Sequence, residues 1–299
     1  MRDKRLTEQR NPRSSRIDHS SSIEIVDLIH LEDRTVATAV GKEREAIARA
    51  IDLTVDALRR GGRLLYVGAG TSGRLGVLDA AEMPPTFGTE PGLVQGIIAG
   101  GPEAMVRAKE GAEDSPEEGA AALRSLDVGP ADFVLGIATS GTTPFVHGAL
   151  DWVRRRGAKT GFLICTYPSD ELIETHDVVI APLVGPEVIT GSTRMKAGTA
   201  TKLILNTITT GAMVLLGKVY GNLMVDLRVT CAKLQDRGER ILMETVGVDR
   251  NRANGLLAEA GGRVKVAIVM GKLGVGPGEA ISLLDGAEGH VSRVVGDLL

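Results

Sequence analysis

Two short segments that combine hydroxyl side chains with glycine carry the most chemical information in this sequence of 299 residues, GAGTSG at 68–73 and ATSGTTP at 138–144. Each directly follows an apolar run that is typical of a buried strand. Hydroxyl groups and the free N–H groups of a helix N-terminus can hold a phosphate monoester without cationic side chains. Serine and threonine at such places also cap helices, but two matching turns favour a phosphate site. The predicted phosphate-binding residues are Gly70, Thr71, Ser72, Ser140, Gly141, Thr142 and Thr143.

The first turn also matches a dinucleotide-binding pattern, because Gly68, Gly70 and Gly73 satisfy GxGxxG after a strand. That pattern requires a second strand that ends in an acidic residue about 20 positions later. Glu90 lies at the right distance, but the surrounding PPTFGTEP is too rich in proline and glycine to form a strand. No Gly-Lys-Ser/Thr ends the turn either, so a P-loop is also excluded.

The elements around these turns alternate between strand and helix patterns. Strands are predicted at Leu64–Val67, Val94–Ile98, Phe133–Ala138, Gly161–Cys165 and Val178–Leu183. Helices are predicted between them at Ala104–Gly111, Glu117–Leu126 and Pro144–Arg156, and two more within Ser20–Arg60. After Met195 the strands stop, and Lys196–Leu216, Asn222–Val246 and shorter pieces over 249–299 form helices. The alternation predicts an α/β fold with a mainly parallel sheet that helices cover on both faces.

Composition excludes several classes of protein. The net charge of −3 and the few aromatic residues argue against a nucleic-acid partner. No apolar run approaches the roughly 20 residues that cross a bilayer, and the charged N-terminus lacks a signal peptide's apolar centre, so we expect no membrane partner and a cytoplasmic location. The basic first sixteen residues are expected to form a solvated arm. Cys165 and Cys231 lack metal-ligand spacing and are expected to be reduced core residues.

Longer strings resemble a known family. GAGTSGRLGVLDAAEMPPTFG, LVQGIIAGG, KEGAEDS and EVITGSTRMKAGTATKLILN, together with LTEQRNP near the start, are similar to N-acetylmuramic acid 6-phosphate etherase, a sugar isomerase (SIS) domain family. The similarity runs from about Leu6 to Val295; Met83 stands where many relatives carry Cys. It implies a three-layer α/β sandwich, the SIS fold, with N-terminal helices and a small C-terminal helical subdomain. The expected division is an N-terminal arm and helices over 1–52, a SIS domain over 53–217 and a C-terminal helical region over 218–299.

The resemblance further implies a homodimeric enzyme, without cofactor or metal, that takes a phosphorylated amino sugar in peptidoglycan salvage. It would cleave the sugar's ether to D-lactate as a carbon–oxygen lyase, giving N-acetylglucosamine 6-phosphate. Glu82 is implied as the general acid and Glu113 as the general base. Glu82 is expected at a helix end just before Pro84–Pro85, where a carboxylate opposes the helix dipole and should resist ionising.

Other residues have less specific assignments. Glu187, Ser192, Arg194 and Lys196 open the long helix after the sheet and could contact substrate or the second subunit. Arg74 could bind the lactyl carboxylate, although a surface ion pair is the safer interpretation. His147 is the one histidine expected near the site, although a core or surface role is the favoured interpretation for it. Two other functions remain open: an aldose–ketose phosphosugar isomerase, and a non-catalytic phosphosugar sensor. A SIS-type transcription regulator is disfavoured, because the N-terminal helices contain no evident recognition helix.

Overall fold

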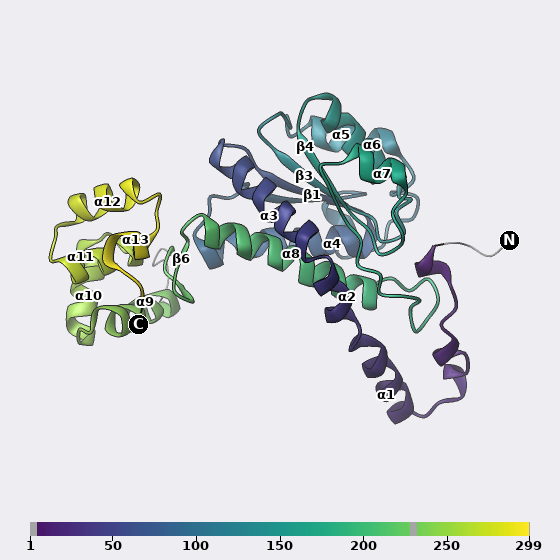
Figure 1. Cartoon of the computed structure of the whole chain (residues 1–299), viewed down its shortest axis with the longest axis horizontal. Coiled ribbons are helices and arrows are strands. Elements are labelled where there is room, and N and C mark those ends of the chain that lie inside the picture. Colours follow the sequence, from purple (N-terminus) through teal and green to yellow (C-terminus); the bar gives the residue numbers. More distant parts are fainter. Residues whose placement is uncertain (1–4, 228–231, 299) are drawn as a thin grey trace. The chain divides into compact units, whose positions relative to one another are not determined.

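The computed structural model describes residues 5–227 and 232–298 (Figure 1). The chain groups into two compact units, each described here by itself. The first unit combines Met1–Ala81 with Gly92–Thr209, and the second combines Glu82–Pro91 with Thr210–Leu299. The three-part division expected from the sequence stays a prediction.

The first unit is built on a parallel sheet with the strand order β2-β1-β3-β4-β5. The strands are β1 (Leu64–Gly68), β2 (Val94–Ile98), β3 (Phe133–Ile137), β4 (Lys159–Leu163) and β5 (Val178–Ile180). Every residue of β1 and β3 is buried, which explains their continuous apolar sequence. The predicted α/β fold with a parallel sheet is confirmed.

Helices cover both faces of this sheet (Figure 1). On one face, Leu65 and Val67 pack in a core with α5 (Pro116–Arg124) and α6 (Pro144–Arg155). On the other face, Tyr66 lies against α4 (Gly70–Phe87), and α3 (Arg44–Arg59) packs beside β5. The short helix α7 (Asp170–Thr175) joins β4 to β5. The alternation of side chains along β1 therefore produces the expected three-layer sandwich.

The N-terminal part has more elements than the sequence pattern indicated. Over residues 5–63, α1 (Ser22–Asp33) and α2 (Val36–Lys42) precede α3, and three 3-10 turns precede α1. The prediction of two helices was wrong, because short breaks at Arg34–Thr35 and Glu43 divide the helical pattern into three. The 3-10 turns span Leu6–Glu8, Pro12–Ser14 and Ile17–His19.

Two further expectations for the first half of the chain were wrong. Helix α4 does not end before Pro84–Pro85 but continues to Phe87. Proline has no N–H, so the carbonyls of Ala80 and Ala81 lose their helical donors there. The predicted helix Ala104–Gly111 is only a 3-10 turn, η4 (Pro102–Met105), followed by turns.

The second unit is mainly helical, as expected. After α8 (Lys196–Leu215), it contains α9 (Ala232–Val246), α10 (Arg250–Glu259), α11 (Val264–Leu273), α12 (Pro277–Gly286) and α13 (Val291–Val295). Buried residues of these helices share one hydrophobic core. The expectation that strands stop after Met195 was wrong, because β6 (Val219–Tyr220) and β7 (Leu223–Met224) form an antiparallel hairpin. The predicted helix Asn222–Val246 accordingly shortens to α9, and its residues 228–231 lie outside the described residues.

None of the described helices is long and apolar enough to span a bilayer alone, and α11 and α12 reach that length only as a pair bent by 104°.

A buried polar cluster joins three elements of the first unit. The Tyr66 hydroxyl on β1 donates to Asp79 of α4 at 2.9 Å, and Asn206 and Thr209 of α8 donate to the same carboxylate at 2.6 and 3.2 Å. Burial raises the pKa of Asp79, and the three donors oppose that shift. The cluster therefore holds α4 to the sheet and to α8.

Tyr66→Phe tests this cluster. The variant leaves one oxygen of buried Asp79 without its donor, which we expect to cost about 1–3 kcal/mol of unfolding free energy. Tyr167→Phe is the matched control, because Tyr167 is 64% exposed, and it should change stability by less than about 0.5 kcal/mol. Urea unfolding at pH 7 measures both, and equal midpoints would contradict the role of the hydroxyl.

Candidate functional site

The parallel pairing of β1 with β3 brings the two hydroxyl-rich turns together. Gly68 pairs with Ile137, so the turns leave the sheet from neighbouring strands at the same edge. This is the point where the strand order reverses, and open α/β sheets bind ligands there. Helix α4 begins at Gly70 and α6 at Pro144, so the first N–H groups of both helices face this edge.

The hydroxyl groups of the second turn are not all used to cap helix α6. Thr143 is the N-cap residue of α6, yet its side chain makes no capping hydrogen bond. Ser140 Oγ and Thr142 Oγ1 lie 3.0 Å apart and bond to each other. The interpretation that these residues serve only as helix caps is therefore not supported at Thr143.

Glycine is required in both turns for different reasons. Gly141 has a φ of +78°, a conformation that L side chains rarely adopt, and its carbonyl lies 2.9 Å from His147 Nε2. A Cβ on Gly73 would lie 2.7 Å from the Gly68 carbonyl oxygen, so only glycine lets α4 start this close to β1. His147 thus lies beside the second turn, as expected, and contacts its backbone.

A small cavity of about 220 Å³ lies beside the first turn. Gly70, Arg74 and Glu113 all line it, so the structure places one predicted catalytic carboxylate next to one predicted phosphate ligand. The Glu113 side chain is exposed, while its carbonyl accepts a hydrogen bond of 3.0 Å from the Phe145 N–H. That bond ties the Glu113 loop to the first turn of α6.

Glu82 belongs to a different part of the structure. It is an exposed residue of α4 and falls in the second compact unit, whereas Glu113 falls in the first. The expected position at a helix end was wrong, because α4 continues to Phe87. The helix-dipole argument for Glu82 as an acid therefore loses its premise, and its role rests on the family resemblance.

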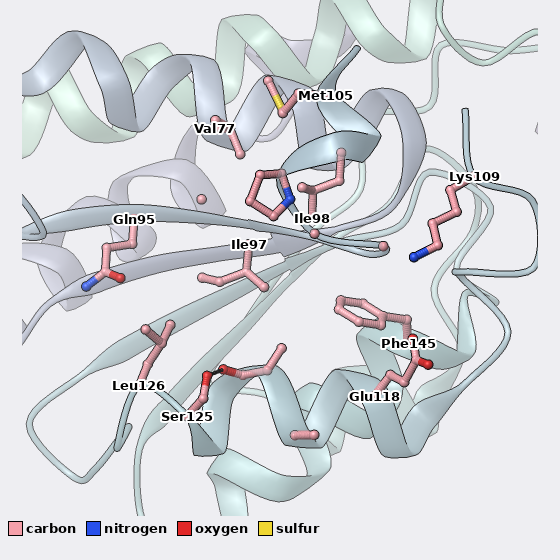
Figure 2. Close-up of a pocket in the computed structure, with 16 residues that line it drawn as sticks. Val77, Gln95, Ile97, Ile98, Met105, Lys109, Glu118, Ser125, Leu126 and Phe145 are labelled. Atoms are coloured by element: carbon pink, nitrogen blue, oxygen red, sulfur yellow. Dashed lines mark hydrogen bonds between the residues drawn. The ribbon is translucent and has the colours of Figure 1, made fainter. Parts of the chain in front are cut away.

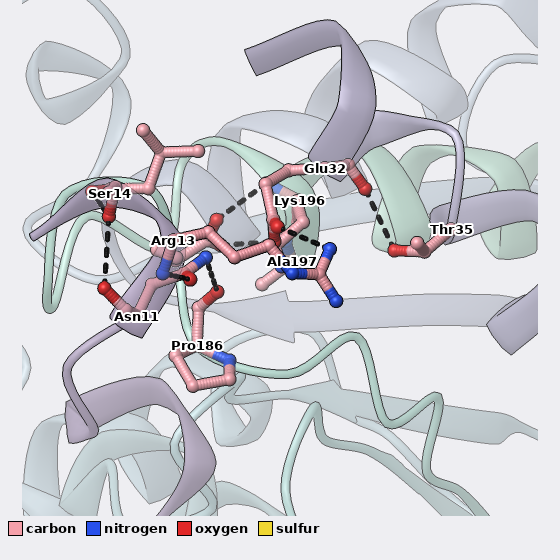
Figure 3. Close-up of polar contacts among 10 residues, drawn as sticks. Asn11, Arg13, Ser14, Glu32, Thr35, Pro186, Lys196 and Ala197 are labelled. Atoms are coloured by element: carbon pink, nitrogen blue, oxygen red, sulfur yellow. Dashed lines mark hydrogen bonds and ion pairs between the residues drawn. The ribbon is translucent and has the colours of Figure 1, made fainter. Parts of the chain in front are cut away.

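Glu187 and Lys196, two of the residues predicted to contact substrate or a second subunit, also have partners within this chain; Figure 3 shows those of Lys196. The Glu187 carboxylate accepts the backbone N–H groups of Lys196 and Ala197 at 3.0 and 2.9 Å, which satisfies the N-terminus of α8. Burial raises the pKa of Glu187, and these two donors oppose that shift. The Lys196 ammonium forms a buried ion pair with Glu32 at 2.6 Å, and Arg13 approaches the same carboxylate at 2.8 Å.

Ser192 and Arg194 lie in the turn before α8. Ser192 is partly buried, and its N–H donates to the Ile189 carbonyl at 2.9 Å; Arg194 is exposed. The start of α8 comes close to the first hydroxyl turn, since a Cβ on Gly198 would lie 3.6 Å from the Thr71 methyl group. Contacts of Ser192 and Arg194 with substrate or a second subunit stay predictions.

The N-terminal arm is docked rather than solvated, which corrects the expectation from its charge. Asn11 donates to the Pro186 carbonyl at 3.3 Å, and Ser14 donates to the Val188 carbonyl at 2.7 Å. The Leu6 N–H donates to Thr166, and Arg5 reaches the Thr142 hydroxyl at 3.4 Å. Composition alone missed these residues, but the LTEQRNP string within the family resemblance could have indicated them.

Among the described residues, neither Cys165 nor a cluster of metal ligands adds a reactive group. Cys165 is fully buried, as expected, and burial together with the nearby Glu187 charge raises its pKa to about 12. Cys231 lies outside the described residues. Within the described ranges, His, Cys, Asp and Glu side chains form no group of three or more that could hold a metal ion.

A larger groove of about 720 Å³ follows the edge strand β2 (Figure 2). Gln95 lies at one end and Lys109 at the other, with Ile97 and Phe145 between them. None of the predicted catalytic or phosphate-binding residues lines this groove. The predicted site residues Gly70 and Glu113 line the smaller cavity instead.

Known proteins are similar to this chain in sequence and in fold. A model of the glucokinase regulatory protein N-terminal SIS domain matches residues 46–154. Proteins named N-acetylmuramic acid 6-phosphate etherase are similar almost end to end: that of Synechococcus elongatus is 53% identical over 97% of this chain and 94% of its own. That of Salinibacter ruber is 54% identical over 97% of this chain and 93% of its own. A solved phosphoheptose isomerase from Francisella tularensis, 18% identical, shares the fold with a TM-score of 0.50 over 64% of this chain and 100% of that one.

Lys196→Met tests the buried ion pair that anchors α8. The two side chains are only 3% and 5% exposed, so the variant leaves the Glu32 charge buried beside the half-exposed Arg13 alone. We expect a loss of about 3 kcal/mol in unfolding free energy at pH 7. The control Lys159→Met, which breaks a partly exposed pair with Asp177, should cost less than about 1 kcal/mol.

The loss should depend on pH in a defined direction. Burial alone would raise the pKa of Glu32, but Lys196, a hydrogen bond from Asn11 and the charge of Arg13 together outweigh it and hold the pKa below the ordinary 4.5. In the native chain, the stabilisation that ionised Glu32 gains from its partners is present above about pH 4.5. It disappears as the pH falls through the pKa of Glu32 in the folded state. The variant can protonate Glu32 instead, so its deficit should narrow between pH 7 and pH 4. A deficit that stays constant in urea unfolding over this range would contradict the ion pair.

Proposed function

The chain belongs to the N-acetylmuramic acid 6-phosphate etherase family, and we propose that it cleaves the D-lactyl ether of N-acetylmuramic acid 6-phosphate to give N-acetylglucosamine 6-phosphate and D-lactate. The observation that carries the proposal is 53% identity over 97% of the chain to a protein of that name. The two hydroxyl turns at the sheet's switch point support it independently, because they suit a sugar phosphate. The proposal includes a cytoplasmic location.

The proposed chemistry is elimination followed by addition of water, which makes the enzyme a carbon–oxygen lyase. In the open-chain sugar, the C1 aldehyde acidifies the C2 proton, and the ether oxygen is on C3. Glu113 takes the C2 proton, the C3–O bond breaks as a C2–C3 double bond forms, and Glu82 protonates the departing lactate oxygen. Water then adds its hydroxyl to C3 and a proton returns to C2.

The position of Glu113 supports its role as the base. It lines the cavity that Gly70 also lines, and its backbone is bonded to the first turn of α6. A sugar held by its phosphate at the turns would therefore be close to this carboxylate. An isomerase shares the removal of the C2 proton but returns a proton to C1, so only release of D-lactate distinguishes the two activities.

Glu113→Gln and Glu82→Gln test the assignment. We expect each variant to lower D-lactate release from N-acetylmuramic acid 6-phosphate by about 10²- to 10⁴-fold, because general acid–base catalysis contributes on that scale. The base is separated from the acid by C2 deuterium exchange in D₂O, which Glu82→Gln should retain and Glu113→Gln should lose. Asp114→Asn and Glu90→Gln are controls, since both alter exposed carboxylates that neighbour these residues in sequence.

Three outcomes would count against this proposal. Wild-type protein that releases no D-lactate would contradict the function. Full activity in either glutamine variant would contradict that residue's role. Equal turnover of the unphosphorylated sugar would contradict the phosphate site.

The proposal includes a homodimer that pairs through α1. Ile23 and Val26 on this helix are 65% and 59% exposed, and α1 extends away from the sheet of its own unit (Figure 1). The two side chains are three residues apart and so share one face of α1, and a contiguous patch of exposed apolar side chains is typical of an interaction surface.

Ile23→Glu combined with Val26→Glu should convert the dimer to a monomer, because burying two carboxylates at an apolar contact is costly. Size-exclusion chromatography with light scattering measures the mass. Val106→Glu, an exposed apolar position away from α1, is the control and should leave the dimer intact. A wild-type monomer, or a variant that stays dimeric, would contradict pairing through α1.

A further inference from the structure

Arg74 is a cation without an anionic partner inside the small cavity. Its Nε donates to the Met105 carbonyl at 3.1 Å and its Nη2 to the Ala104 carbonyl at 2.7 Å. Both acceptors are neutral, and Arg74 forms no ion pair with any residue that the structure describes, so the expected surface ion pair was wrong. A guanidinium has five N–H donors, and these two bonds leave three of them for a ligand.

The two carbonyls fix where the guanidinium lies. They belong to η4, and Ala104 itself lines the cavity together with Arg74. Arg74 is only partly exposed, so its charge is held at the cavity wall rather than in open solvent. An arginine that is already positioned loses less conformational freedom when it binds an anion.

The other walls of the cavity leave polar recognition to few groups. Alanine and glycine supply most of the lining, and the remaining charged side chains are Lys109, Glu110 and Glu113. Lys109 also borders the larger groove, and its flexible side chain is exposed. Arg74 is therefore the cation that hydrogen bonds hold in place at the wall of this cavity.

We propose that Arg74 binds the carboxylate of the substrate's lactyl group and makes the enzyme specific for an acidic leaving group. This inference rests on the proposed function. The planar guanidinium fork matches a carboxylate, whereas the neutral donors of the two turns already suit the phosphate. The lactyl oxygen is on C3, next to the C2 proton that Glu113 takes, so the carboxylate and the base belong in the same cavity.

The test compares two substrates in each variant. Wild-type enzyme should prefer N-acetylmuramic acid 6-phosphate over its lactyl carboxamide by roughly 10- to 100-fold in kcat/KM, on the scale of a hydrogen bond to a charged group. Arg74→Gln should reduce this preference to about threefold or less, and Arg74→Lys should retain part of it. Because each variant is its own reference, a general loss of activity or stability cancels from the ratio.

Two control variants locate the effect. Arg107→Gln removes an exposed cation that is near Lys109 in sequence but does not line the cavity. The preference for the acid over the carboxamide should therefore stay at the wild-type level. Lys109→Gln removes the other cation of the cavity. Loss of the preference in Lys109→Gln with its retention in Arg74→Gln would overturn the assignment.

The outcomes separate this inference from the function beneath it. An unchanged acid-to-amide ratio in Arg74→Gln, in an enzyme that still releases D-lactate, overturns the role of Arg74 alone. Wild-type protein that releases no D-lactate from either substrate overturns the proposed function and this inference with it.

Discussion

The parallel pairing of β1 with β3 is the constraint on which the site depends. Because Gly68 pairs with Ile137, both following turns leave the same edge of the sheet, and α4 and α6 start side by side. Their free N–H groups and hydroxyls then face one place, which a phosphate can occupy without cationic residues in either turn. Gly73 keeps this arrangement possible, since any Cβ there would collide with the Gly68 carbonyl.

Buried polar groups fix the helices that surround this edge. Asp79 accepts hydrogen bonds from both β1 and α8, and Glu32 meets Lys196 at the start of α8. A buried ion pair adds little net stability over a well-packed apolar pair, because desolvation offsets the attraction between the charges. These groups instead select one arrangement of the helices, because their polar atoms find partners in it. In that arrangement the start of α8 lies close to Thr71.

The sheet could be predicted because local pattern and tertiary environment agree there. A strand buried on both faces needs a continuous apolar run, and Leu64–Val67 was predicted within one residue of the observed β1. The partly buried edge strand Val94–Ile98 was predicted at its observed bounds. Contacts between residues that are distant in sequence could not be predicted from the local sequence pattern. The N-terminal arm reads as charged and solvated, yet Asn11 and Ser14 bond to carbonyls of residues 186 and 188. Helix α4 likewise passes through Pro84–Pro85, where local rules place a helix end.

The candidate site likewise contains residues that could be predicted from sequence and residues whose roles could not. The hydroxyl turns could be predicted because glycine and threonine directly after a strand are enough to indicate a turn. The role of a charged residue could not, because it depends on which side chains the fold places beside it. Glu187 and Lys196 were predicted to contact substrate or a second subunit, and the sequence pattern did not indicate the buried partners that both have within the chain. Arg74 shows the reverse: a surface ion pair was the expectation, and the fold gives it neutral carbonyls and a cavity. In the proposed mechanism, the phosphate of the substrate binds to the neutral donors of the two turns, and the carboxylate of the departing lactate binds to the guanidinium of Arg74.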